Sequence, residues 1–258
     1  MFRIARTGRE PVGLGWRRSH VSASVLILAM SAVSGCASQA SSPSPTATVE
    51  ARPLSQKQLE SARLAEGEAG RYGVGLGSET PADMEPGETS ATPEACLPAI
   101  KVLLHGWAKG ATAYTRFNLS DSTNTVGVRS VALTSYHAGE AKRVFAAVEK
   151  SLQDCPSVVY KPMLGTSVHA KLSLGEPLAP GDESLRAIMS FSMKGIDNHT
   201  AYGLVRIGNV LAWFKFNETF GSTLPQQKKA ALTPVLPESL VAQQVKKVET
   251  IMETTSTP

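Results

Sequence analysis

The sequence predicts an α+β fold, in which an antiparallel β-sheet packs against helices in a single compact domain. One observation behind this prediction is the clear helical periodicity of residues 140–152. The other is a series of stretches in the second half of the chain where apolar and polar residues alternate, with turn residues between the stretches. Because strands joined by short turns pair antiparallel, this series predicts at least three adjacent antiparallel strands.

The clearest predicted helix covers residues 140–152. Its apolar residues recur at helical spacing on one face, while lysine, arginine and glutamate residues occupy the other face. Further helices are expected at residues 96–107 and 238–252. Ser55, with Gln58 three residues later, has the N-cap pattern of a short helix.

The predicted strands begin with residues 126–136, which are rich in β-branched side chains and whose alternation shifts midway, as at a β-bulge. Residues 168–174 and 185–193 alternate regularly and are typical of half-buried strands. Residues 201–216 are interrupted by Gly208-Asn209. A glycine at the first position of a two-residue loop predicts a hairpin with a type II′ turn.

Residues 1–35 have the three parts of a secretory signal, namely an arginine-rich start, an apolar stretch and small residues before a cysteine. The apolar stretch is too short for a permanent membrane span, which takes about 20 apolar residues. Val33–Cys36 matches a lipobox, so we predict a lipoprotein signal peptide at residues 1–35. The export route stays open, since Arg17-Arg18 lacks the apolar pair that usually follows a twin arginine.

Cys36 is the predicted lipidation site, because only a cysteine can form the thioether to a diacylglyceryl group. Each buried methylene of a lipid contributes about 0.8 kcal/mol, and two acyl chains anchor a protein stably. We therefore expect a lipid-anchored protein on the extracytoplasmic face of the cell membrane. Residues 36–53 are rich in Ser, Pro, Thr and Ala and read as a flexible tether, residues 54–252 as the domain, and residues 253–258 as a disordered tail.

The charge of the chain argues against a nucleic-acid partner. The full sequence has 26 basic and 22 acidic residues, but the signal peptide holds five of the basic ones and one of the acidic ones. Its removal leaves 21 of each, so the mature chain is neutral. Phosphate-backbone binding needs a clustered excess of lysine and arginine, and the sequence does not predict one.

Cys96 and Cys155 are the cysteines that remain if Cys36 is lipidated. In an oxidising space outside the cytoplasm such a pair is expected to form a disulfide. The closed loop would contribute about 4 kcal/mol in the chain-entropy model. A reactive or metal-binding thiol is the competing interpretation, but the sequence has neither a CxxC spacing nor a histidine cluster beside them.

No familiar catalytic, metal or cofactor motif is present. The histidines after the signal region are far apart in the sequence, so none forms the i, i+4 pair of a helical metal site. His105, followed by Gly106 and Trp107, is the one arrangement that invites a catalytic interpretation, and a capped helix end is the favoured one. We expect no metal, no cofactor and no enzymatic activity.

Trp213 and Met193 are the candidate residues of a ligand cleft. On the predicted strand, Phe214 and Phe216 fall on one face and Trp213 on the other. The simpler interpretation of these aromatic residues is a core with one exposed ring. The alternative is that Trp213 or Met193 faces a ligand.

Several scattered features together resemble the PknH-like extracellular sensor domain, the exported part of a mycobacterial receptor kinase that also occurs alone in actinobacterial lipoproteins. The resemblance covers roughly residues 54–252 and rests on Cys96, Ser135-Tyr136, the helix from Glu140 to Cys155, Pro180–Ser184 and Val205–Asn209. It implies an antiparallel sheet packed with helices, braced by disulfides, with a surface cleft for an unidentified ligand. This chain differs in having no kinase segment and only two cysteines beyond the lipobox.

The resulting hypothesis is a non-catalytic sensor or ligand-binding module of the cell envelope, whose partners are the membrane lipid at Cys36 and an unknown envelope ligand or protein. One alternative is an envelope hydrolase or transferase with a site assembled from distant residues, which requires a nucleophile, a base and an orienting group in one cleft. Lipid carriage is a variant of the binding hypothesis and predicts an enclosed cavity large enough for an acyl chain.

Overall fold

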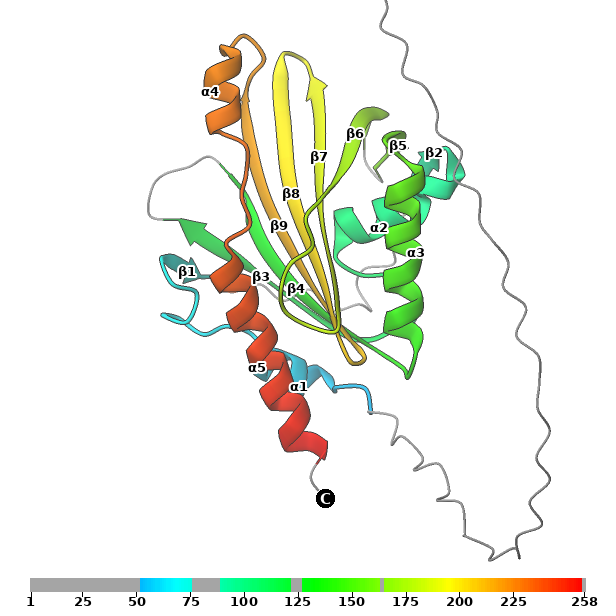
Figure 1. The fold of residues 1–258 in the computed structure, drawn as a ribbon, viewed down its shortest axis with the longest axis vertical. Coiled ribbons are helices and arrows are strands. Elements are labelled where there is room, and N and C mark those ends of the chain that lie inside the picture. The colour runs from blue at the N-terminus through cyan, green and yellow to red at the C-terminus, as the bar shows by residue number, and fades with distance from the viewer. Residues whose placement is uncertain (1–51, 76–88, 122–126, 163–164, 257–258) are drawn as a thin grey trace, which may run out of the picture. The chain divides into compact units, whose positions relative to one another are not determined.

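A nine-stranded antiparallel sheet forms the centre of the described chain, with strand order β1-β3-β4-β9-β8-β7-β6-β5-β2 (Figure 1). The computed structural model describes residues 52–75, 89–121, 127–162 and 165–256, which belong to one compact unit. The strands are β1 (Tyr72–Val74), β2 (Ser90–Thr92), β3 (Ala111–Asp121), β4 (Arg129–Tyr136), β5 (Ser157–Lys161), β6 (Val168–Gly175), β7 (Glu183–Met193), β8 (Ile196–Ile207) and β9 (Val210–Gly221). The predicted α+β class with an antiparallel sheet is confirmed.

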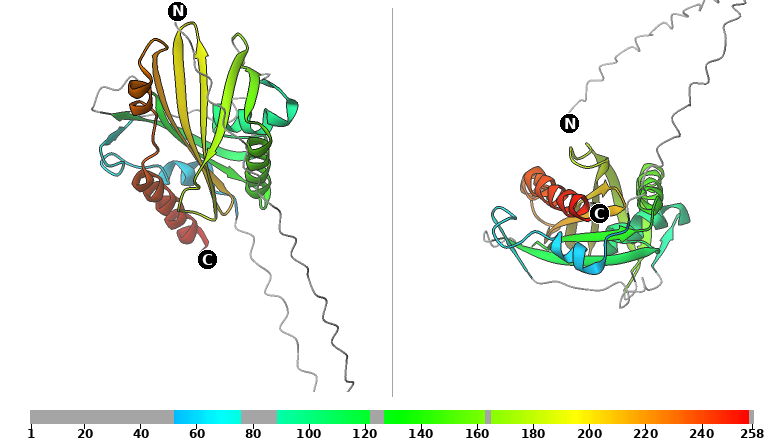
Figure 2. Two further views of the ribbon diagram at one scale, coloured as in Figure 1. Left: turned by 45° about the horizontal axis from the view of Figure 1, so that its top comes forward. Right: turned by 90° about the horizontal axis from the view of Figure 1, so that it is seen from below.

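Helices cover both faces of this sheet. They are α1 (Gln56–Ser61), α2 (Leu97–His105), α3 (Glu140–Asp154), α4 (Gln226–Ala231) and α5 (Glu238–Ser256), with a short 3₁₀ turn at Glu94–Cys96. Figure 2 shows α3 and α5 on different sides of the curved sheet, with β8 and β9 between them. The sheet therefore divides the interior into two cores.

The first core, here called the α2/α3 core, packs apolar side chains of α2 and α3 against one face of the sheet. It contains Ile100, Leu103, Phe145, Leu152, Tyr202 and Trp213, among others. The second, the α1/α5 core, lies on the opposite face and contains Leu59, Phe117, Phe214, Phe216, Val241 and Val245, among others. Consecutive residues of β9 point into different cores, and this is why the central strands read as almost continuously apolar.

Hydrogen bonds hold both ends of α1, and only the bonds at its start were predicted. Ser55 and Gln58 form the expected capping box, in which Gln58 Oε1 accepts a hydrogen bond from the Ser55 amide at 2.8 Å. On α5, the fully buried Gln244 donates to the carbonyl of Ala62 at 2.7 Å and accepts from the amide of Leu64 at 3.3 Å. These bonds satisfy buried main-chain groups just after α1 and join the two ends of the domain.

Two tight turns set the register of the longest strands. Gly208 lies at φ 54° between β8 and β9, where Ile207 pairs with Val210, and this agrees with the predicted two-residue hairpin. The sequence analysis missed the equivalent turn between β7 and β8. There Lys194 and Gly195 both have positive φ, at 52° and 77°, as a type I′ turn requires.

Two local predictions are corrected, and a third is not tested. The predicted bulge in residues 126–136 is absent from β4, whose residues are buried on both faces, and the register instead shifts on β3 between Ala111 and Ala113. Residues 253–256 continue α5 where a disordered tail was predicted. The predicted signal peptide, and the tether up to residue 51, lie outside the described residues.

Candidate functional site

Cys96 and Cys155 form the predicted disulfide. Their Cα atoms are 5.8 Å apart, and both side chains are buried in the α2/α3 core. The bond joins the start of α2 to the end of α3, two helices that pack on the same face of the sheet. These cysteines therefore have a structural role in the interior.

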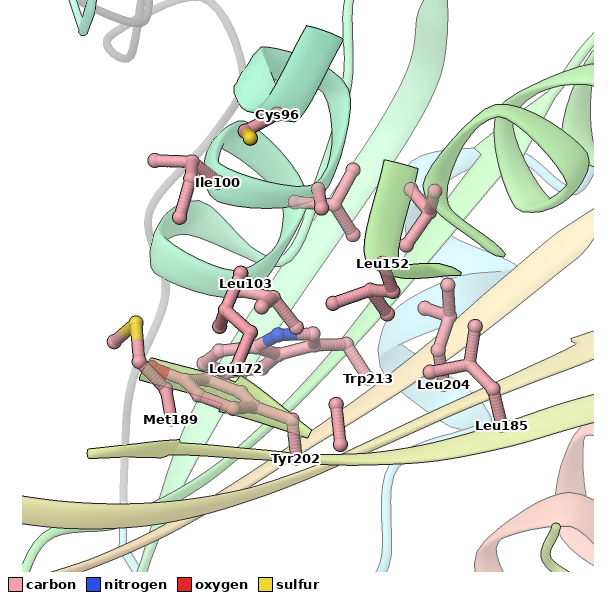
Figure 3. Close-up of a cluster of buried hydrophobic side chains, with 14 of the residues drawn as sticks. Cys96, Ile100, Leu103, Leu152, Leu172, Leu185, Met189, Tyr202, Leu204 and Trp213 are labelled. Carbon is pink, nitrogen blue, oxygen red and sulfur yellow. The ribbon is translucent and has the colours of Figure 1, made fainter. Parts of the chain in front are cut away.

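Trp213 and Met193, the candidate cleft residues, lie in different surroundings. Trp213 is 0% exposed and packs beside Tyr202 in the α2/α3 core, with the two ring centroids 6.1 Å apart (Figure 3). The prediction that Trp213 faces an open cleft is wrong, because helices cover this face of the sheet as well. Met193 is 43% exposed at the end of β7, next to the β7–β8 turn.

His105, the other candidate, ends α2 next to Gly106, whose left-handed conformation caps the helix. Its Nε2 atom lies 3.3 Å from Thr89 Oγ1. Burial, together with the nearby cations of Arg116, Lys215 and Lys101, lowers the pKa of His105. Among the described residues no carboxylate is hydrogen-bonded or ion-paired to it, so the base-and-acid pair of a hydrolase is not assembled there.

The cations beside His105 belong to a feature that the sequence analysis missed, here called the basic sheet patch: Arg116 on β3, Lys215 on β9 and His105. Strand β4 lies between β3 and β9, and its fully buried Ser130 pairs with Lys215. Arg116 Nη2 donates to Ser130 Oγ at 3.4 Å, and Ser130 donates to Asn118 Oδ1 at 2.7 Å. Ser130 on β4 thus orients the guanidinium of Arg116.

Arg116 also covers the buried aromatic residues at this end of the α2/α3 core. Its guanidinium carbon lies 5.5 Å from the centroid of the Trp213 ring, within cation–π range. Its charge also acts on Tyr202, whose pKa is raised mainly by burial. The Tyr202 hydroxyl is fully buried, with Thr200 beside it.

Lys215 is the second cation of the patch. Burial and the charge of Arg116 lower the pKa of Lys215 to about 8, so the protein disfavours its protonated form. Within the described ranges, neither Lys215 nor Arg116 has an ion-pair partner, whereas other partly buried cations do. Arg129 lies 2.7 Å from Glu218, and Lys229 lies 2.8 Å from Asp197. The basic sheet patch therefore carries positive charge that this part of the protein leaves uncompensated.

A hollow of about 230 Å³ lies on the other face of the sheet, beneath residues 232–235. Its floor holds Arg129, which lies 3.6 Å from Asp121 and 2.7 Å from Glu218, with Tyr72 and Phe216 beside it. A second hollow, of about 270 Å³, lies between residues 69–72 and the start of α5. Both are smaller than typical ligand pockets of about 300–1,000 Å³, and neither provides the acyl-chain cavity that lipid carriage predicts.

Neither a metal-ligating cluster nor a membrane-spanning helix is found among the described residues. No group of three or more histidine, cysteine, aspartate or glutamate side chains in this part of the chain could hold a metal ion. None of its helices combines the length and apolar composition that a bilayer crossing requires.

Comparison with solved structures identifies the fold. The extracellular domain of PknH from Mycobacterium tuberculosis superposes with a TM-score of 0.50 over 78% of this chain and 99% of that domain, at 13% sequence identity. The described domain has a PknH-like fold. An uncharacterised protein from Mycobacterium smegmatis is also similar, with a TM-score of 0.39 at 12% identity, over 74% of this chain and 94% of that one. No family model and no curated protein sequence matches this chain.

Sequence reasoning missed the basic sheet patch because its residues come from distant parts of the chain. Arg116 and Lys215 come together only because β4 pairs with both β3 and β9, which are far apart in the sequence. One local signal was available: Lys215 is the single charged residue in the otherwise apolar run of residues 210–216. A lone cation in a central strand is costly unless it has a partner, so such a position is a candidate site.

Proposed function

We propose that this protein is a lipid-anchored, extracytoplasmic module of the cell envelope that binds a ligand or partner protein without catalysing a reaction. The observation that supports it best is the PknH-like fold, which matches nearly the whole of an extracellular domain. The predicted signal peptide and lipobox agree with that location, as does the buried disulfide, a bond that persists mainly in oxidising compartments.

The anchoring part of the proposal depends on Cys36. A diacylated cysteine binds a membrane stably, whereas the neutral mature chain has little electrostatic attraction to anionic lipids. In the Cys36→Ser variant we expect the protein to leave the washed membrane fraction and to lose incorporation of an alkyne-tagged palmitate. Equal labelling and membrane retention of the variant would refute lipidation at this residue.

The binding part of the proposal is tested by native mass spectrometry of the full chain, released from detergent after incubation with an envelope extract. We expect a discrete added mass that survives mild activation, whose value identifies the ligand class. A bare protein peak, together with no cross-linked protein partner on intact membranes, would contradict a binding function.

A further inference from the structure

We propose that the basic sheet patch is an oxyanion site, in which Arg116 and Lys215 bind a phosphate or carboxylate group of the ligand. This inference rests on the proposed function, since it names the chemical class that such a binding module would recognise. It is carried by two features of the described residues: two neighbouring cations without an ion pair, and a buried hydroxyl that accepts a hydrogen bond from one of them.

The two cations of the basic sheet patch destabilise the ligand-free protein. Placing a partly buried lysine near an arginine is unfavourable, because each is desolvated and their charges repel. Elsewhere in the domain a carboxylate neutralises such a cation: Arg129 pairs with Glu218, and Lys229 pairs with Asp197. In the basic sheet patch, an anionic group of a ligand would neutralise the two cations.

Ser130 orients Arg116 in the ligand-free protein. Ser130 is fully buried and accepts from Arg116 while donating to Asn118, so the guanidinium is held before any ligand arrives. A positioned guanidinium presents paired N–H donors that match two oxygens of a phosphate or carboxylate. Preorganisation of this kind reduces the entropy lost on binding.

The hydrogen-bond donors of the basic sheet patch determine which kind of anion fits. The patch offers N–H donors from Arg116 and Lys215, with His105 beside them. A group with several acceptor oxygens around one centre satisfies such a set. A long polyanion does not fit, since two cations form no track along the surface and the mature chain is neutral overall.

Binding is expected to be coupled to protonation of Lys215. Burial and the charge of Arg116 disfavour the protonated form of Lys215. Arg116, Lys215 and Lys101 of α2 in turn disfavour the protonated form of His105. A bound anion reverses that effect and raises the pKa of Lys215. At pH 8.5, where much of Lys215 is neutral in the free protein, anion binding should therefore take up protons.

The experiment is isothermal titration calorimetry of the full chain in a neutral detergent, with inorganic phosphate, acetate and dihexanoyl phosphatidic acid as probes. We expect at least one probe to bind, with affinity reduced tenfold or more in Lys215→Met and in Arg116→Gln. Lys171→Met is the matched control, because Lys171 is an exposed strand lysine on β6 and should bind as the unmodified protein does. Phosphatidic acid binding more tightly than phosphate would assign the site to a lipid headgroup, and the reverse order to a free anion.

Proton uptake separates a binding role from a structural one. Titrations at pH 8.5 in two buffers of different ionisation enthalpy should show proton uptake that disappears in Lys215→Met, while circular dichroism confirms that both variants are folded. Failure of all three probes to bind, or equal affinity in Lys215→Met and the control, would overturn the proposal. If an envelope ligand binds Lys215→Met as tightly as the unmodified protein, the proposed function stands and only this site is rejected. If phosphate binds at this site but no envelope ligand or partner is found, the site stands and the proposed function is rejected.

Discussion

Replacement of Lys215 by methionine should make the ligand-free domain more stable at neutral pH. The pKa of this lysine falls from its ordinary 10.5 to about 8 in the folded protein. At 1.36 kcal/mol for each pH unit, that difference corresponds to about 3 kcal/mol that the charged side chain costs the folded state. Because solvent reaches part of the side chain, we expect about 1–3 kcal/mol of this to appear as added stability in Lys215→Met.

The stability that Lys215→Met adds should depend on pH, because Lys215 loses its proton at a lower pH in the folded protein than in the unfolded chain. Between pH 8 and 10.5 the unfolded chain keeps the Lys215 proton while the folded chain has lost it. Raising the pH through this window therefore stabilises the folded unmodified protein, and the same contribution is absent in Lys215→Met. The stability difference between the two proteins should be largest below pH 8 and should shrink toward pH 10.

Urea unfolding followed by tryptophan fluorescence measures this directly, since Trp107 and Trp213 are both buried in the α2/α3 core. Titrations at pH 7, 8, 9 and 10 for the unmodified protein, Lys215→Met and the exposed control Lys171→Met give the three stability curves. A Lys215→Met protein that is less stable at pH 7, with a difference that does not change with pH, would refute the claim that this charge is uncompensated.

Two other perturbations test the packing around the candidate site. Replacing Cys96 and Cys155 together by alanine should lower the free energy of unfolding by about 4 kcal/mol, because the disulfide closes a loop between residues separated by 59 positions. The oxidised unmodified protein is the reference. A loss below about 1 kcal/mol would contradict the structural role of the disulfide. Gln244→Ala should cost about 2–4 kcal/mol, because it leaves a buried amide and a buried carbonyl after α1 without partners. The exposed Gln243→Ala is its control, and equal melting temperatures for the two variants would show that these bonds contribute little.

The elements that sequence reasoning predicted well carry a strong local signal. The helix expected at residues 140–152 is α3 (Glu140–Asp154), because its amphipathic pattern extends over several turns. The β8–β9 hairpin was predicted because glycine supplies the positive φ that its turn requires. In contrast, β3 was missed, because residues 113–115 are buried on both faces and the alternation is confined to its second half, where Phe117 and Leu119 are buried and Asn118 and Ser120 are exposed.

The candidate site could not be predicted in the same way. Trp213 was chosen because large aromatic residues often line ligand sites, but helices on both faces of the sheet place it in the interior. Arg116 and Lys215 meet through strand pairings that link distant parts of the chain, and a single sequence does not specify such pairings. The disulfide was predictable, because compartment and cysteine count left one pairing.

The central claim is that Lys215 has no carboxylate partner among the described residues and gains a counter-charge when an anion binds. The most direct test is an NMR titration of the protein labelled with ¹³C at the lysine ε carbon, from pH 6 to 11, with Lys215→Met used to assign the signal. The account predicts a Lys215 pKa near 8 in the free protein that rises by at least one unit when phosphate or dihexanoyl phosphatidic acid is added. A pKa near 10.5 in the free protein, or one that no probe changes, would contradict it.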